Sequence, residues 1–333
     1  MNTPRLPGLA AGACCLSLLV AHATAIAGPL GDRLRARLEG QPSPAQTTEP
    51  DLDEGMEAFR ASGRLPTGVA RLADRAYGPH SAQRYDVYLP SRRPMQTMPI
   101  IAMVHGGGWA HGDKAHAPVV DNKVRRWLPR NVALVSVNYP MLPETPPLEQ
   151  ARHVARALAS MQRDAPSWGG DPRQVVLMGH SAGAHLVALL TAHPAFTQAE
   201  GALPWLGTVS LDSAAFDVVA VMSGRHLALY DRAFGTARSD WVAASPLHQL
   251  TRMAAPMLAV CSSRRADACP QARSFAAAIP SDAPEMHILP VPLSHGDINA
   301  TLGKPGSYTD AVERFIEGLP GWSVRLSGEP SRR

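Results

Sequence analysis

Short runs of consecutive apolar residues recur along the middle of the chain. Such runs occupy residues 99–104, 132–137, 174–178 and 256–260, while residues 84–89 alternate between apolar and polar positions. Continuous apolar runs of this length are typical of strands buried on both faces of a parallel sheet, and alternation is typical of a half-exposed strand. The pattern therefore predicts several buried strands and one strand with a solvated face.

The stretches between these runs have helical spacing. One helical face collects Leu148, Ala151, Val154, Ala155 and Leu158. A second, more apolar helix is expected at residues 182–193. Strands that alternate with helices predict a single α/β domain, with a mostly parallel sheet covered by helices on both faces.

The two ends of the chain lack this alternation. We expect the folded domain at residues 69–320, after a flexible linker or N-terminal extension at residues 28–68 and before a solvated tail at residues 321–333. Residues 1–27 have the pattern of a secretory signal peptide, in which one positive charge precedes a short apolar run and small residues for cleavage.

The apolar part of this signal is too short to span a bilayer, which takes about 20 residues. We therefore expect an exported protein, periplasmic or secreted, without stable membrane insertion after cleavage. Lipidation of Cys14 is the alternative, although the residues before it match a lipid-attachment sequence poorly.

Composition excludes several classes of protein. The 333 residues are 45% hydrophobic and 18% charged, which rules out disorder across the whole chain. The net charge of +4 comes from 32 basic and 28 acidic residues that are scattered along the chain. Because nucleic-acid binders gather their basic residues on one stripe, we expect no nucleic-acid partner.

The pentapeptide Gly179-His180-Ser181-Ala182-Gly183 lies between a predicted strand and a predicted helix. A G-x-S-x-G sequence in this place forms a sharp turn that lifts the serine hydroxyl above the sheet. A helix-capping serine with close-packed glycines is the alternative. The context favours Ser181 as a nucleophile.

Three consecutive glycines follow another predicted strand, in His105-Gly106-Gly107-Gly108-Trp109. Glycine backbone N–H groups are unobstructed and suit an oxyanion that develops during acyl transfer. A phosphate loop would need Gly-Lys-Ser/Thr at its end, which is absent here. This loop, followed about 75 residues later by the serine turn, is more specific than either motif alone.

Together these motifs resemble the α/β-hydrolases of the hormone-sensitive-lipase-like and BD-FAE (feruloyl-esterase-related) carboxylesterase group. The resemblance covers about residues 70–320 and includes Gly112-Asp113-Lys114, Asn138-Tyr139-Pro140, Asp171-Pro172 and His185-Leu186. It implies the α/β-hydrolase fold and an oxyanion hole formed by the N–H groups of Gly107, Gly108 and Ala182. One departure is Pro140, where relatives usually have arginine.

The resemblance also implies a base and an acid that follow the serine in the order Ser, Asp/Glu, His. His295 lies in a loop that matches the catalytic loop of the family, whereas His287 lies inside a predicted strand. Between Ser245 and His295, Asp267 comes soonest after a predicted strand and is the expected acid, although the glycine that relatives have before it is missing. The other carboxylates there, Asp282 and Glu285, are expected to be solvated, and Asp297 is a local alternative.

Two cysteines, Cys261 and Cys269, remain after signal cleavage and flank Asp267. We expect them to form a disulfide that holds the acid loop, since an exported protein meets an oxidising compartment. Two buried thiols are the alternative. No cysteine pair or carboxylate completes a metal site around His105, His111 and His116, so we expect no metal and no cofactor.

These residues predict a serine carboxylesterase for small-molecule esters with a short acyl chain or an aryl group. Arylformamidase-like amide hydrolysis is one alternative, and a catalytically inactive hydrolase-fold binding protein is another. Residues 214–244 are long enough for a small cap, and Trp109 is a candidate substrate-binding residue. Other candidates for the pocket wall are Phe216, Leu229, Tyr230 and Trp241.

Overall fold

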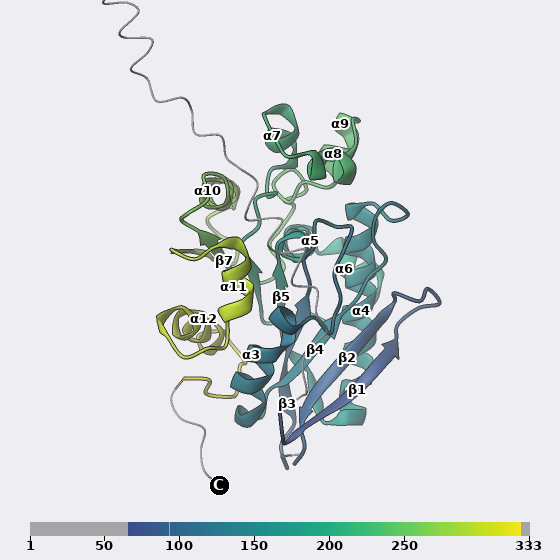
Figure 1. Ribbon diagram of the computed structural model, residues 1–333, viewed down its shortest axis with the longest axis vertical. Coiled ribbons are helices and arrows are strands. Elements are labelled where there is room, and N and C mark those ends of the chain that lie inside the picture. Colours follow the sequence, from purple (N-terminus) through teal and green to yellow (C-terminus); the bar gives the residue numbers. More distant parts are fainter. Residues whose placement is uncertain (1–65, 93, 328–333) are drawn as a thin grey trace, which may run out of the picture. The chain divides into compact units, whose positions relative to one another are not determined.

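The computed structural model describes residues 66–92 and 94–327. The predicted signal peptide, almost all of the predicted extension at residues 28–68 and the end of the predicted tail lie outside these ranges. The described residues form a domain built on an eight-stranded sheet with the order β1-β2-β4-β3-β5-β6-β7-β8 (Figure 1). The strands are β1 (Val69–Ala76), β2 (Arg84–Pro90), β3 (Met98–Val104), β4 (Ala133–Val137), β5 (Gly170–His180), β6 (Gly207–Leu211), β7 (Met257–Ser262) and β8 (Met286–Val291).

The direction of the strands follows the prediction of a mostly parallel sheet. β2 pairs antiparallel with β1 and with β4, and all other neighbouring strands are parallel. Every predicted strand is present. β1 was not predicted because Arg71, Asp74 and Arg75 interrupt its few apolar positions, and its pairing with β2 at the sheet edge explains why it forms.

Side chains that alternate along the central strands build two cores. On β3, Ile100 and Ala102 belong to one cluster of buried apolar residues, whereas Ile101 and Met103 belong to another. Successive side chains of a strand point to opposite faces of the sheet, so the two clusters lie on its two sides. The continuous apolar run that predicted this strand is thus explained by burial on both faces.

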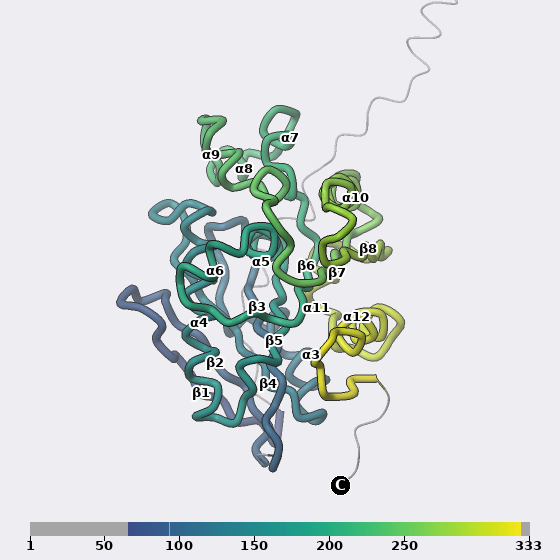
Figure 2. The backbone as a smooth tube through the Cα atoms, turned by 180° about the vertical axis from the view of Figure 1, so that it is seen from behind, coloured from purple at the N-terminus to yellow at the C-terminus, as the bar shows by residue number. Residues whose placement is uncertain are grey.

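Helices cover each of these faces. α4 (Pro147–Trp168) and α5 (Ala182–Ala192) pack on the first cluster, and α3 (Ala117–Trp127) and α12 (Ser307–Glu317) pack on the second (Figures 1 and 2). The remaining helices are the 3-10 helix Leu128–Arg130, α6 (Ala195–Ala199), α7 (Val218–Ser223), α8 (Ala228–Phe234), α9 (Arg238–Ala243), α10 (Ala268–Ala278) and α11 (His295–Thr301). Among the described residues, no helix combines the length and the apolar character needed to cross a membrane.

The short helices α7, α8 and α9 lie together at the top of Figures 1 and 2. They occupy the stretch between β6 and β7 in which the sequence predicts a small cap. Phe234 of α8 packs against Trp109 of the glycine loop, with ring centroids 4.9 Å apart. The cap is therefore joined to the loop that follows β3.

Candidate active site

Ser181 lies in the turn between β5 and α5 with a backbone φ of 55°, a conformation that few residues other than glycine adopt. The two glycines of the motif make this turn possible by their lack of a side chain. A Cβ at Gly179 would lie 2.3 Å from the carbonyl oxygen of Gly183, and a Cβ at Gly183 would lie 2.3 Å from that of Val104. Close packing of strand, turn and helix thus fixes Ser181 in its strained position at the end of the sheet.

The glycine loop after β3 runs directly beside this serine. A Cβ at Gly106 would lie 2.8 Å from the Cβ of Ser181, so only glycine allows the approach. Gly107 and Gly108 have φ values of 108° and 58°, which place them in the left-handed region. Ala182 is the first residue of α5, where backbone N–H groups are not used by the helix.

Two further motifs of the sequence support this loop. The side-chain oxygen of Asn138 accepts from the N–H of Lys114 at 2.5 Å, and its amide donates to Asp113 at 2.9 Å. Tyr139 stacks on the ring of His105 and donates its hydroxyl to the His105 carbonyl at 2.9 Å. The segments around residues 113 and 138 therefore hold the start of the glycine loop in place.

His295 begins α11, and its imidazole contacts a buried carboxylate. Nδ1 of His295 lies 2.7 Å from Oδ2 of Asp212, a residue in the turn that follows β6. Burial alone would raise the pKa of Asp212, but the hydrogen bond and charge of His295, the charge of Arg265 and the N–H of Ser262 together lower it well below its ordinary value. Asp212 is therefore an anion that keeps the Nδ1 proton of His295, which leaves Nε2 free to act as a base.

Backbone hydrogen bonds connect the turns that carry these side chains. The N–H of Ser181 donates to the carbonyl of Leu211 at 2.9 Å, and the N–H of Asp212 donates to Val260 at 2.8 Å. The N–H of Ser262 then donates to Oδ1 of Asp212 at 2.7 Å. The ends of β5, β6 and β7 thus fix the serine and the aspartate relative to each other, independently of the surface loops.

The carboxylate expected beside His295 was that of Asp267, and the structure has that of Asp212 there instead. Asp267 lies at the start of α10 with its side chain 51% exposed, and its Oδ2 accepts from Nη2 of Arg265 at 3.1 Å. Arg265 stands between the two carboxylates, because its Nη1 lies 2.8 Å from Oδ2 of Asp212. The physical reason is position along the chain: Asp212 directly follows a strand, whereas Asp267 comes after a loop that turns it towards solvent.

Residues 85–229 match the family model described as BD-FAE. Over this part of its length the protein resembles the BD-FAE-type α/β-hydrolases. It resembles the probable isoprenylcysteine alpha-carbonyl methylesterase ICME of Oryza sativa subsp. japonica, with 30% identity over 125 residues that cover 38% of this chain and 29% of that protein. It also resembles the esterase LipQ of Mycobacterium tuberculosis, with 31% identity over 186 residues that cover 48% of this chain and 43% of that protein.

The matched stretches thus span less than half the length of these relatives. Among solved structures, esterase B from Lactobacillus rhamnosis superposes with a TM-score of 0.63 at 16% identity, covering 80% of this chain and 88% of that chain. At this identity the superposition shows a common fold. The α/β-hydrolase fold predicted from the motifs is confirmed.

In this α/β-hydrolase, the serine, the histidine and the glycine loop line one cavity of about 660 Å³. Its lining includes Leu227, Leu229, Tyr230 and Arg232 from the cap, and His111 and Asp113 from the loop after β3. Apolar and polar side chains therefore both line the cavity. Phe216 and Trp241, the other wall candidates, are not among its lining residues; Phe216 instead stacks on Phe275 below the cap.

Trp109 also lines this cavity, but its side chain is almost fully buried. Its indole Nε1 donates to Nδ1 of His185 at 3.2 Å, and its ring packs against Tyr230 and Phe234 of α8. Burial lowers the pKa of His185 to about 4, so this imidazole is neutral and can accept the bond. Trp109 therefore connects the glycine loop to the cap, and only a small part of its side chain faces the cavity.

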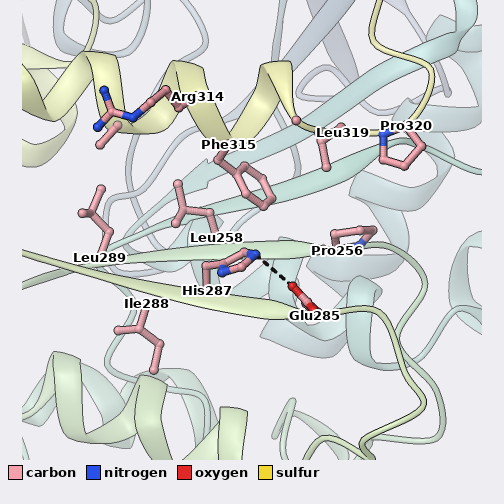
Figure 3. Close-up of a pocket in the computed structure, with 12 residues that line it drawn as sticks. Pro256, Leu258, Glu285, His287, Ile288, Leu289, Arg314, Phe315, Leu319 and Pro320 are labelled. Carbon is pink, nitrogen blue, oxygen red and sulfur yellow. Dashed lines mark ion pairs between the residues drawn. The ribbon is translucent and has the colours of Figure 1, made fainter.

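His287, the other histidine late in the sequence, is remote from this cavity. It lies on the edge strand β8 with its side chain 57% exposed, and its Nε2 is 3.4 Å from Oε2 of Glu285 (Figure 3). Phe315 of α12 lies beside it in a separate groove at the sheet edge. The prediction that His287 lies in a strand is confirmed, whereas His295, expected in a loop, is the first residue of α11.

Three residues at the site were not foreseen from the sequence: Asp212, Arg265 and His180. His180 precedes the serine, stacks on His295 with ring centroids 4.6 Å apart, and places its Nε2 2.9 Å from the carbonyl oxygen of His295. Burial and the neighbouring charge of His295 lower its pKa well below the ordinary value, so the ring is neutral and donates this bond. His180, the residue before the serine in G-x-S-x-G, therefore helps to hold His295 at the start of α11.

The predicted disulfide is present between Cys261, near the end of β7, and Cys269 in α10. It closes the loop that carries Arg265 and Asp267. Within residues 66–92 and 94–327, no cluster of three or more His, Cys, Asp or Glu side chains has the arrangement of a metal site.

Proposed function

We propose that this protein is a serine carboxylesterase that hydrolyses short-chain or aryl esters through an acyl-enzyme intermediate. The observation that carries the proposal is the occurrence, in one cavity, of a strained serine, a histidine bound to a buried aspartate and a glycine loop with positive φ values. This combination is the constellation of acyl-transfer catalysis. Esterase relatives among known proteins support the same reaction class.

In the first half of the reaction, Nε2 of His295 takes the proton of Ser181 as Oγ attacks the ester carbonyl. Asp212 stabilises the imidazolium that forms and keeps the ring in the required tautomer. The negative charge on the carbonyl oxygen is received by the N–H groups of Gly107, Gly108 and Ala182. When the tetrahedral intermediate collapses, the C–O bond of the ester breaks and His295 returns the proton to the leaving alcohol.

In the second half, water replaces the alcohol and attacks the acyl-enzyme, with His295 again as the base. The carboxylic acid leaves and Ser181 regains its proton from His295. Asp212 takes the role that the sequence assigned to Asp267, because Asp212 is the carboxylate that contacts the imidazole.

The walls of the cavity support small esters. Leu227, Leu229 and Tyr230 offer apolar surface for an acyl or aryl group, next to polar lining residues such as Arg232 and His111. A cavity of about 660 Å³ is in the size range of pockets that hold small molecules.

The test is hydrolysis of p-nitrophenyl esters with acyl chains of two to about twelve carbons, together with labelling by a fluorophosphonate. We expect label on Ser181, fastest turnover at the short chains, and no turnover or labelling for S181A. S167A, which changes an exposed serine of α4 outside the cavity, serves as a matched serine control. Undiminished turnover by S181A would refute the proposal, and the absence of both labelling and turnover of any ester or p-nitroacetanilide would favour a binding protein.

We further propose that the protein is exported, periplasmic or secreted. Support comes from the signal-like composition of residues 1–27 and from the disulfide, since disulfides persist in oxidising compartments. Fusion of residues 1–50 to a phosphatase that folds only outside the cytoplasm tests this directly. Absence of phosphatase activity, with full expression of the fusion, would contradict it.

A further inference from the structure

Arg265 occupies an unusual place for a cation in a site that works with a basic histidine. Its Nη1 lies 2.8 Å from Oδ2 of Asp212 and 3.0 Å from Nδ1 of His295, and its Nη2 lies 3.1 Å from Oδ2 of Asp267. The carboxylate oxygen that receives Arg265 is the same one that receives His295. The guanidinium thus competes with the imidazole for the charge of Asp212.

The direction of each hydrogen bond follows from the chemistry of the groups. Arginine can only donate, and Nδ1 of His295 carries the proton that points to Asp212. Nη1 therefore donates to Asp212, and its contact with Nδ1 is a close approach of two donors. That approach destabilises the protonated imidazole, because a second positive charge then stands next to the first.

We infer that Arg265 is a positioning residue for the reaction, which holds the carboxylate of Asp212 through Nη1 and so limits how strongly that carboxylate stabilises the imidazolium of His295. The inference rests on the proposed ester hydrolysis. The exposed carboxylate of Asp267 fixes the guanidinium from the solvent side, because it accepts a hydrogen bond from Nη2 of Arg265. The disulfide closes the loop that carries both residues.

Arg265 is a mostly buried part of the site. Its side chain is only 16% exposed and lines the catalytic cavity. Burial would lower its pKa, but the charges of Asp212 and Asp267 outweigh burial and raise it, so the cation persists throughout the working range of the enzyme. A planar fork with two separate donors is needed to reach two carboxylates at once, which lysine cannot do.

The other charged or titratable groups around His295 do not supply the same effect. From β5, His180 is neutral, and from α3, the buried Lys123 reaches α11 through Asn299, to whose side-chain and main-chain oxygens it donates. On α11 itself, Asp297 accepts from the hydroxyl of Ser294.

From α12, Tyr308 donates its hydroxyl to the carbonyl of Ile298, and burial raises its pKa, so it is uncharged. Arg265 is therefore the cation that acts on the His295–Asp212 pair by direct contact among the described residues.

The test compares R265Q, R265K and D267N with R264Q in the full chain. Arg264 is the adjacent arginine, exposed and outside the cavity, so R264Q makes the same change of charge in the same loop. The measurement is the pH dependence of kcat/KM for p-nitrophenyl acetate, together with the titration of the His295 ring C–H signals by NMR.

For R265Q we expect the midpoint of the acid limb to rise by about 0.5–1 pH unit and kcat to fall about tenfold. R265K retains the charge, so its midpoint stays within about 0.2 pH unit of the parent while kcat falls severalfold. D267N removes a negative charge and shifts the midpoint the opposite way, by about 0.2–0.3 pH unit, because Asp267 is exposed. R264Q leaves both kcat and the midpoint unchanged.

Equal midpoints for R265Q and R264Q would overturn the inference. If R265Q does not fold, the inference is tested by the other two variants, for which we expect a lower acid-limb midpoint in D267N and an unchanged one in R265K. A D267N midpoint that stays in place or rises contradicts the inference. Because NMR reads His295 without substrate, the role of Arg265 is decided even in a protein that hydrolyses no ester. Loss of ester hydrolysis with the expected NMR shifts would refute only the proposed function.

Discussion

Two aspartates follow neighbouring parallel strands, and they have very different surroundings. Asp212 comes directly after β6, is fully buried and accepts hydrogen bonds from a histidine, an arginine and a backbone N–H. Asp267 comes five residues after β7, is half exposed and accepts from Arg265. Both lie at the same end of the sheet, where the carboxyl ends of parallel strands bring catalytic groups together.

The difference shows how distance from a strand end decides which carboxylate contacts the histidine. A residue next to a strand end is held in place by the backbone hydrogen bonds of the sheet, such as the one from the N–H of Asp212 to the carbonyl of Val260. A residue farther along a loop has more conformational freedom, and its side chain is solvated unless other contacts hold it. Here the disulfide and Arg265 hold the loop, but they orient Asp267 towards the guanidinium rather than the imidazole.

The largest effect is expected for D212N. The amide retains the size of the side chain but can present its NH₂ group to Nδ1 of His295, which favours the wrong tautomer, so we expect kcat to fall about 10³-fold or more. The measurement is kcat for p-nitrophenyl acetate, with circular dichroism to show that the variant folds. A loss of less than tenfold would mean that Asp212 is a structural anion.

Much of this site is predictable from the sequence, because its signals are local. Ser181 and the three glycines before Trp109 stand out because each motif directly follows a predicted strand, and His295 stands out because it lies outside the strand that contains His287. The pairing of Cys261 and Cys269 was predicted because they are the two cysteines that remain after signal cleavage, in a chain expected to meet an oxidising compartment. For the serine, the glycines and the histidine, a short stretch of sequence is enough.

Asp212 was missed for a different reason. The family pattern directs the search for an acid to the stretch after the next strand, where Asp267 is present. The signal that could have found it is that Asp212 directly follows the apolar run Gly207–Leu211, beside the strand that carries the serine. Arg265 gives no such signal, since an arginine two residues from an aspartate looks the same as a surface ion pair.

The second largest effect concerns the loop after β7. In the double variant C261S/C269S, we expect the free energy of unfolding to fall by about 2–3 kcal/mol, because the short loop is no longer closed in the unfolded chain. Urea unfolding with and without dithiothreitol measures it. Reductant should destabilise the parent by a similar amount and leave the double variant unchanged. Two free thiols in the denatured, unreduced mature protein, which lacks Cys14 and Cys15, would exclude the bridge.

A smaller effect distinguishes the buried aspartate by its pH dependence. The pKa of Asp212 is lower in the folded protein than in the unfolded chain, so the unfolded state binds more protons as the pH falls below about 5. The stability that Asp212 contributes is therefore present at neutral pH and is lost in acid. Between pH 6 and pH 3, we expect the stability difference between the parent and D212N to change by about 1 kcal/mol in favour of the variant, as measured by urea unfolding.

The smallest effect is expected for D267N at the pH optimum. The variant loses one exposed ion pair with Arg265, an interaction worth about 0–1 kcal/mol, and leaves the contact between Asp212 and His295 intact. We expect kcat to change by no more than about threefold, against the loss of about 10³-fold for D212N. If D267N instead lost activity as completely as D212N, the loop would have to rearrange during the reaction so that Asp267 replaces Arg265 beside the imidazole, and the comparison of the two aspartates would be reversed.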